Sequence, residues 1–240
     1  MIVFREEVIG DARLILADCH EVELPREGAA IVSDPPYGVK TNTARGSRRR
    51  TGYFAINGDG CRDFPAIIGD DRPFDPAPWL AWPEVILWGA NHYADKLPTG
   101  TRWLVWDKRR DVAPDDNGDC ELAWTNLRGV IRKHSQLWRG LCREGEENIV
   151  NGVWREHPTQ KPVALMAWCV SMVKAQTIVD PYLGSGTTGV AAVRDGRAFV
   201  GCEMHEPYFD VACRRIEQAY RQPRLFAEPA PKPSQMELVP

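Results

Sequence analysis

Apolar positions along the chain fall into short runs that are separated by polar stretches rich in glycine and proline. Short, mostly β-branched apolar runs are typical of strands buried on both faces, as in a parallel sheet. The clearest run lies at 29–34, where Ala-Ala-Ile-Val precedes a polar end. Strands are predicted at 13–17, 29–34, 84–88, 102–106, 177–180 and 198–203, with one more near the N-terminus at 2–4 or 8–9.

Helical patterns alternate with these runs. Residues 163–173 are almost entirely apolar and predict a buried helix, 187–194 predict a helix of small residues, and 207–220 predict an amphipathic helix. A short helix is predicted at 76–82. Strands that alternate with helices are typical of an α/β fold, so we predict a three-layer, doubly wound, mostly parallel sheet.

The length of 240 residues allows one domain, which we assign to residues 1–221. Within it, 38–75 lacks periodicity and is predicted to form a long loop beside the first motif described below, and 107–156 is the least regular stretch and the candidate insertion. Residues 222–240 hold five prolines and are predicted to form a disordered tail.

The first motif, Asp34-Pro35-Pro36-Tyr37, ends the strand at 29–34. Doubly wound sheets place their chemistry at the carboxyl ends of such strands, and the two prolines stiffen the turn. A carboxylate and a carbonyl can accept both hydrogens of an exocyclic amine while its ring stacks on Tyr37. Taken alone, the motif is equally consistent with a rigid strand exit.

The second motif begins where the strand at 177–180 ends in Asp180, followed by Pro181-Tyr182-Leu183-Gly184-Ser185-Gly186-Thr187. The glycines let the backbone approach a ligand closely beside a helix N-terminus. Glu203, at the tip of the next strand, is placed to hold ribose hydroxyls. Residues 184–189 also spell the dinucleotide fingerprint, so a nicotinamide oxidoreductase is an alternative. Against it, the glycines do not follow the strand directly, and Asp180 would repel a pyrophosphate.

Together the two motifs resemble those of the S-adenosylmethionine-dependent amino-methyltransferases of DNA. The catalytic motif precedes the cofactor loop, which resembles the permuted β group of these enzymes. The resemblance covers roughly residues 8–220. Further segments that fit it are 17–19, 88–91, 103–108, 121–124 and 157–162.

The resemblance implies a Rossmann-like methyltransferase fold with permuted motif order, and methyl transfer from S-adenosylmethionine to N6 of a flipped adenine in double-stranded DNA. Cytosine N4 is the alternative target; Asp34 at the first motif position favours adenine. The implied catalytic residues are Asp34, Pro35, Pro36 and Tyr37, and Tyr37 is expected to act through its ring and not its hydroxyl. The implied cofactor-binding residues are Asp18, Cys19, Thr159, Lys161, Asp180, Pro181, Leu183, Gly184, Ser185, Gly186, Thr187 and Glu203.

Among these, Thr159 and Lys161 are expected at the methionine carboxylate, although Lys161 is equally consistent with a solvated lysine at a helix start. His157 is a weak candidate for a base, and Trp124 is predicted to be a core residue.

The net charge of −3 gives no global signal for nucleic acid, but two acid-free basic runs do, at 40–52 and 125–143. Either run is also consistent with solvated loop arginines. The candidate DNA-binding residues are Arg45, Arg48, Arg49, Arg50, Arg109, Arg128, Arg132, Lys133 and Arg139. A chain this small offers little surface for reading several base pairs, so a homodimer is expected.

Seven cysteines without a CxxC pair predict reduced thiols and no metal site, and no apolar run approaches the ~20 residues of a membrane helix. The N-terminus has no signal-peptide layout, so we expect a cytoplasmic protein. A non-catalytic DNA-binding module is a further alternative, and the sequence leaves a restriction endonuclease partner open.

Overall fold

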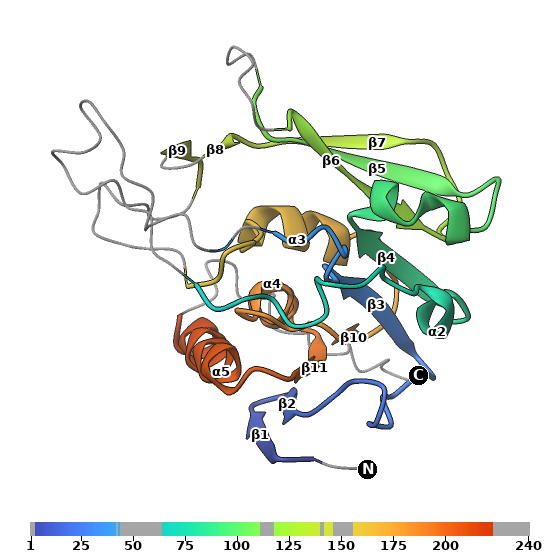
Figure 1. The fold of residues 1–240 in the computed structure, drawn as a ribbon. Coiled ribbons are helices and arrows are strands. Elements are labelled where there is room, and N and C mark those ends of the chain that lie inside the picture. The colour runs from blue at the N-terminus through green and yellow to red at the C-terminus, as the bar shows by residue number, and fades with distance from the viewer. Residues whose placement is uncertain are drawn as a thin grey trace, which may run out of the picture.

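The computed structural model describes residues 3–41, 43, 64–110, 118–139, 142–145 and 156–222. One nine-stranded sheet runs through it in the order β1-β2-β11-β10-β3-β4-β6-β5-β7 (Figure 1). Its strands are β1 (Arg5–Ile9), β2 (Ala12–Leu16), β3 (Ala29–Ser33), β4 (Glu84–Trp88), β5 (Arg102–Asp107), β6 (Cys120–Thr125), β7 (Arg132–Ser135), β10 (Thr177–Asp180) and β11 (Ala198–Glu203). Strands β8 (Trp138–Arg139) and β9 (Cys142–Arg143) form a separate two-stranded ribbon.

The five central strands, from β2 through β11, β10 and β3 to β4, are parallel to one another. Strand β1 is antiparallel to β2, and β6 is antiparallel to both of its neighbours. The buried, mostly apolar strand β3 and the apolar middle of β10 suit the centre of such a sheet, because both faces are covered there.

Helices cover both faces of the sheet, which makes three layers (Figure 1). On one face lie α3 (Val163–Val170), α4 (Thr187–Arg194) and α5 (Glu206–Arg221), which pack side by side. The other face carries the short helix α2 (Ala77–Leu80) and the 3-10 turns η1 (Ala90–His92) and η2 (Ala94–Lys96). The predicted three-layer, doubly wound, mostly parallel α/β fold is confirmed, although the second helical layer is thin.

Each face has its own core. Phe199, Leu165 and Ile216 are fully buried between the sheet and α3–α5. Ile31 and Trp124 belong to the core on the opposite face, so the prediction that Trp124 is a core residue is confirmed.

Residues 107–156 contain more regular structure than we predicted. Strand β6 lies inside the main sheet between β4 and β5, and β7 extends its edge. The first half of β6 is only partly buried, and Glu121 interrupts its apolar residues. Its place depends on pairing with strands on both sides, which a local pattern does not reveal. The assignment of 107–156 to target recognition stays a prediction, as do the domain boundaries.

Much of the predicted 38–75 loop and almost all of the predicted 222–240 tail lie outside the described residues. The helices that the structure does describe include none with the length and apolar character needed to cross a bilayer.

Strands β3 and β10 are neighbours, and the chain leaves them in opposite directions. From β3 it continues to β4 on one side, and from β10 it continues through α4 to β11 on the other. This is the switch point at which doubly wound sheets form a crevice beyond the carboxyl ends of their strands. The candidate site should therefore lie above β3 and β10.

We expect Phe199→Ala to lower the free energy of unfolding by about 3–5 kcal/mol, because the ring is fully buried and its removal leaves a cavity. Urea denaturation with linear extrapolation measures the loss. The control is Val8→Ala on β1, where the side chain is 69% exposed and a change within about 0.5 kcal/mol is expected. Similar values for the two variants would contradict this assignment of the core.

Candidate active site

A cavity of about 530 Å³ lies at the carboxyl ends of the central strands. Asp18 and Cys19 line it after β2, Glu203 at the end of β11, and Asp34 after β3. The strand order therefore places Asp18 and Glu203 toward one end of the cavity and Asp34 toward the other. A cavity of this size can enclose a cofactor-sized ligand.

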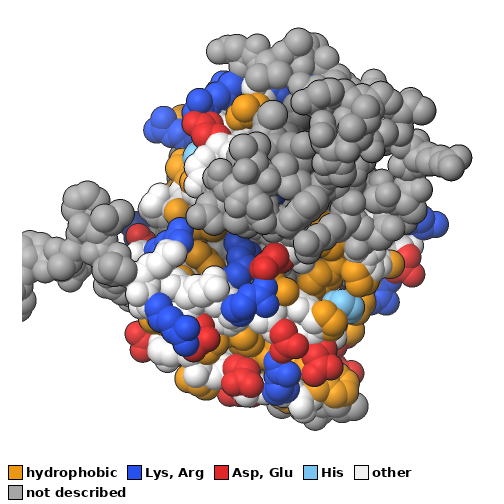
Figure 2. Space-filling view, turned by 90° about the vertical axis from the view of Figure 1, so that its left-hand side faces the viewer, with side chains coloured by type: hydrophobic (Ala, Val, Ile, Leu, Met, Phe, Trp, Pro, Cys, Tyr) orange, Lys and Arg blue, Asp and Glu red, His pale blue; other side chains and the backbone are white. Residues whose placement is uncertain are grey.

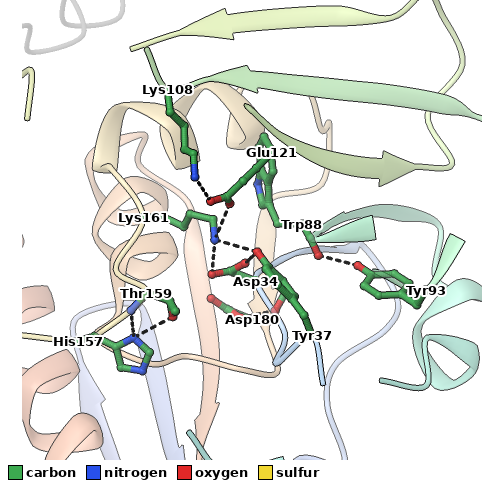
Figure 3. Close-up of polar contacts among 11 residues, drawn as sticks. Asp34, Tyr37, Trp88, Tyr93, Lys108, Glu121, His157, Thr159, Lys161 and Asp180 are labelled. Carbon is green, nitrogen blue, oxygen red and sulfur yellow. Dashed lines mark hydrogen bonds and ion pairs between the residues drawn. The ribbon is translucent and has the colours of Figure 1, made fainter. Parts of the chain in front are cut away.

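Asp34 and Tyr37 are joined by an ammonium group that the sequence had not connected to them (Figure 3). Lys161 Nζ donates to Asp34 Oδ2 at 2.6 Å and to the Tyr37 hydroxyl at 2.9 Å. The Tyr37 hydroxyl in turn donates to Asp34 Oδ1. Both carboxylate oxygens therefore have a fixed partner, which sets the plane of the carboxylate.

A second carboxylate and a second ammonium extend this arrangement away from the cavity (Figure 3). Glu121 Oε2 lies 3.1 Å from Lys161 Nζ, and Lys108 Nζ donates to Glu121 Oε1 at 2.8 Å. Burial raises the pKa of Glu121, but the two lysines more than offset this and bring it down to about 2. Glu121 is therefore ionised at neutral pH.

The ring of Tyr37 is held from one side. The His92 ring stacks on it with centroids 5.2 Å apart and planes 17° apart. Gly89 follows β4 with φ +71, and a Cβ at this position would lie 2.0 Å from Tyr37 Cε1. Glycine at position 89 is therefore needed both for the left-handed backbone and for the close approach of the ring.

The carboxylates of Asp180, which is buried, and Glu203, which is half-buried, shape the glycine loop. Asp180 Oδ1 accepts from Ser33 Oγ at 2.5 Å, a bond that joins the ends of β10 and β3. Glu203 accepts from the backbone N–H groups of Gly184 at 2.8 Å and His205 at 2.8 Å. Burial raises the pKa of Asp180 to about 6 and that of Glu203 to about 7, against the opposing effect of these hydrogen bonds.

The loop is also held from α5 by a residue that we had not selected. Arg215 donates to the Ser185 carbonyl at 2.6 Å and to Thr187 Oγ1 at 3.1 Å. Gly186 begins α4 against the same helix, where a Cβ would lie 2.9 Å from that of Ala212. Gly186 therefore allows α4 to pack closely on α5. It does not line the 530 Å³ cavity.

The residues predicted to bind a cofactor line two cavities, which share Thr159 and Gly184. Asp18, Cys19, Thr159, Pro181, Gly184 and Glu203 line the large cavity. Thr159, Lys161, Asp180, Leu183, Gly184, Ser185 and Thr187 line a smaller one of about 40 Å³ that also contacts Asp34. Thr159 Oγ1 lies 3.2 Å from His157 Nδ1. The cofactor-binding roles of these residues stay predictions.

Sequence reasoning missed Lys108, Glu121, His92 and Arg215 as parts of the site. The sequence signal for Lys161 as a site residue was its place between Gln160 and Pro162, directly before an apolar helix. The same place was equally consistent with a solvated lysine. The expectation that Tyr37 acts through its ring alone did not anticipate that its hydroxyl bonds to both Asp34 and Lys161.

Asp18, Cys19 and His20 bring three ligand atoms to within 4.8 Å of one another. Burial raises the pKa of the Cys19 thiol to about 12, so without a metal this residue is a neutral thiol. The absence of a metal site stays a prediction.

The predicted DNA-binding residues are dispersed. Arg128 and Arg132 flank the β6–β7 turn, which the register places beside the start of β5, at the edge of the sheet opposite Asp34. Arg109 has a 5% exposed side chain and pairs with Asp119, so it is not available to a phosphate in this conformation. Lys133 is exposed and lies 3.3 Å from Asp107.

Arg45, Arg48, Arg49 and Arg50 lie outside the described residues, as does the side chain of Arg139. The face seen in Figure 2 mixes Lys and Arg with Asp and Glu in its described part. The DNA-binding assignments stay predictions.

A family model described as DNA methylase matches residues 84–214, which is more than half of the chain. The chain belongs to the DNA methylase family. The match begins at β4 and ends within α5, so it includes Lys108, Glu121, Lys161 and the glycine loop.

Two relatives of this DNA methylase are named as Type II methyltransferases. M2.DpnII of Streptococcus pneumoniae is 31% identical over 136 residues, which are 56% of this chain and 42% of that protein. M2.MboI of Moraxella bovis is 31% identical over 121 residues, 49% of this chain and 41% of that protein. The chain thus matches about two fifths of the length of these curated relatives.

Among solved structures, the PvuII DNA methyltransferase, described as cytosine-N4-specific, aligns with a TM-score of 0.52 at 12% identity. The alignment covers 92% of this chain and 95% of that one. At this identity the likeness supports the fold, and it confirms the predicted Rossmann-like methyltransferase architecture.

We expect Glu203→Gln to flatten the dependence of stability on pH between about 4.5 and 7. The pKa of Glu203 is about 7 in the fold, whereas an unfolded glutamate titrates near ~4.3. In this window the folded state keeps a proton that the unfolded state has lost, so wild-type stability falls as pH rises. Loss of this group should reduce the decline by about 2–3 kcal/mol.

The measurement is urea denaturation of the ligand-free protein at several pH values. The slope is the readout, because replacing an acceptor beside backbone N–H groups adds an offset that does not depend on pH. Equal slopes in wild type and variant would contradict the raised pKa of Glu203.

Proposed function

We propose that this DNA methylase transfers a methyl group from S-adenosylmethionine to the N6 amine of adenine in duplex DNA. One observation carries the proposal: the Asp34–Tyr37 turn and the Gly184 loop, which end neighbouring strands, line the same cavity. An amine-binding turn and a cofactor-binding loop thus meet at one crevice. Membership of the DNA methylase family supports this combination.

The residues at the cofactor end fit S-adenosylmethionine. Glu203 and Asp18 offer carboxylate oxygens to ribose hydroxyls and adenine, and Gly184, with φ +52, allows close backbone approach. The carboxylate of Asp180 suits the ammonium of the methionine end. When bound, the cofactor supplies an electrophilic methyl group on a sulfonium.

The residues at the other end fit an exocyclic amine. Asp34 and the Pro35 carbonyl each accept one amine hydrogen, which favours a nitrogen whose lone pair points toward the methyl donor. Methyl transfer by in-line displacement would form the C–N bond as the C–S bond breaks, and the amine proton that is lost would pass to water. Most of the rate comes from positioning, and the Asp34 carboxylate stabilises positive charge developing on nitrogen.

The target base must leave the duplex to reach this cavity, which costs a few kcal/mol. His92 covers one face of the Tyr37 ring. We propose that the base stacks on the other face, which returns ~1–3 kcal/mol.

Adenine is favoured over cytosine because Asp34 stands at the first position of the motif. Cytosine N4 is the second candidate, since it carries the same type of amine. The PvuII enzyme is described as acting on cytosine N4, but at 12% identity it does not decide the base here. A nicotinamide oxidoreductase and a non-catalytic binding module find no support in the family match.

We propose a homodimer that works in the cytoplasm on double-stranded DNA, with Arg45, Arg48, Arg49 and Arg50 of the basic run at 40–52 contacting phosphates. Relatives named as Type II methyltransferases support a role in restriction and modification. An endonuclease partner remains a prediction.

The deciding assay is transfer of tritium from methyl-labelled S-adenosylmethionine to unmethylated plasmid DNA. Digestion to nucleosides then distinguishes N6-methyladenine from N4-methylcytosine. We expect the first. Label in N4-methylcytosine alone would overturn the choice of base, and binding of NAD without binding of S-adenosylmethionine would overturn the whole proposal.

Asp34→Asn should lower the transfer rate at least ~100-fold, the scale for losing one preorganised electrostatic group. Calorimetry should show S-adenosylmethionine affinity within a few-fold of wild type, because Asp34 acts on the amine. Asp95→Asn, an exposed aspartate on η2, is the matched control and should retain wild-type rates. More than a tenth of wild-type turnover in Asp34→Asn would contradict the role of Asp34.

Tyr37→Phe should lower the rate about tenfold or more, because it removes the bonds between the hydroxyl, Asp34 and Lys161. Tyr37→Ala should lose more, since the stacking ring is gone as well. Single-turnover rates measure both variants. A wild-type rate in Tyr37→Phe would restore the expectation that only the ring matters.

A further inference from the structure

We propose that Lys161 is a positioning residue for methyl transfer: its ammonium, held between Asp34 and Glu121, keeps the Asp34 carboxylate ionised and oriented toward the target amine. The inference rests on the proposed function and deepens it. It also gives the Lys161 ammonium a role different from the contact with the methionine carboxylate that the sequence suggested.

The geometry accounts for the charge on Lys161. Its side chain is 6% exposed, and an ammonium so deeply buried is costly unless acceptors surround it. Two hydrogen bonds, to Asp34 and to the Tyr37 hydroxyl, and an ion pair with Glu121 provide these acceptors. A lysine that merely began a helix in solvent would have no such surroundings.

The contacts continue as a row of alternating charges from the cavity outward: Asp34, Lys161, Glu121, Lys108 (Figure 3). The four residues come from separate parts of the fold. Asp34 follows β3, Lys108 follows β5, Glu121 lies on β6, and Lys161 precedes α3. Two carboxylates balance two ammonium groups, so removing one member leaves an uncompensated buried charge.

This row matters because only an ionised Asp34 can stabilise the positive charge that develops on the amine nitrogen, and an ionised carboxylate is also the stronger hydrogen-bond acceptor. Burial raises the pKa of Asp34, whereas Lys161 beside it opposes that shift. The other charged or titratable groups that act on Asp34 or are acted on by it are Glu121, Tyr37, Asp180 and Tyr93. Lys161 is the cation among them, and its own pKa is raised by Asp34 and Glu121 against the effect of burial.

Orientation follows from the same contacts. Lys161 holds Asp34 Oδ2 at 2.6 Å, and the Tyr37 hydroxyl holds Oδ1. The remaining lone pairs of the Asp34 carboxylate are available to a ligand in the cavity that Asp34 lines. Glu121 acts one step further out, because it fixes the position of the ammonium.

The test compares single-turnover rates across pH for wild type, Lys161→Met, Lys161→Arg and Glu121→Gln, with saturating tritiated S-adenosylmethionine and unmethylated plasmid DNA. Lys161→Met leaves burial unopposed, so the pKa of Asp34 rises. The acid limb of the rate profile should move at least one pH unit upward, with a loss of ~100-fold or more at neutral pH. Lys161→Arg keeps the charge and should bring the acid limb back toward wild type.

Glu121→Gln should move the acid limb in the opposite direction. Glu121 raises the pKa of Asp34, so its neutral replacement leaves Lys161 to act on Asp34 alone. Opposite shifts from two neighbouring variants are not expected of a merely structural role. Lys174→Met, at an exposed lysine, is the control and should keep the wild-type profile.

Cofactor affinity separates the two roles of Lys161. A positioning residue predicts S-adenosylmethionine binding within a few-fold of wild type in Lys161→Met, measured by calorimetry. Weakened binding with an unmoved acid limb would assign Lys161 to the methionine carboxylate and overturn the proposal. A wild-type profile in Lys161→Met would also overturn it.

Two further outcomes are distinguishable. If wild type transfers no methyl group, the proposed function fails, whatever Lys161 does. If Lys161→Met does not fold, as judged by thermal unfolding, Glu121→Gln carries the test, and an acid limb that fails to move downward overturns the inference.

Discussion

Parallel pairing of β3 with β10 is the constraint on which this protein depends. The two strands are 147 residues apart at the Ser33–Asp180 hydrogen bond, yet they pair directly and end at the same edge of the sheet. The chain departs from them in opposite directions, which opens a crevice above their ends. Asp34 and the Gly184 loop face each other only because of this pairing, and the proposed chemistry requires them to do so.

The site built on this pairing holds carboxylates in two electrostatic settings. At the cofactor end, Asp180 and Glu203 have raised pKa values because they are buried and their partners are neutral donors. At the amine end, burial raises the pKa of Asp34 as well, but the Lys161 ammonium opposes the shift. Under the proposed function Asp34 must be ionised to stabilise positive charge that develops on the amine, whereas a carboxylate that holds backbone N–H groups and hydroxyls accepts in either state. The fold supplies a cation where the chemistry needs one.

The residues proposed to recognise DNA are less localised than those of the proposed catalytic site. Arg128 and Arg132 lie at the edge of the sheet opposite Asp34, and Lys133, the next residue of β7, pairs with Asp107. Arg109, two residues after Asp107, is buried and pairs with Asp119. Contact between phosphates and the basic run at 40–52 stays a proposal.

The sequence alone determined most of the parallel sheet and both motifs. Apolar runs at 29–34 and 177–180 are local signals, and the polar residues that follow them had to lie at strand ends, because a parallel sheet aligns those ends at one edge. Tertiary structure decided what no local pattern encodes. Strand β6 carries Glu121 in its first half and gains its place from partners on both sides, and this pairing brings Glu121 to Lys161. The environment of Lys161 likewise comes from two distant segments, 34–37 and β6, so its sequence neighbours could not separate a solvated lysine from a buried ion pair.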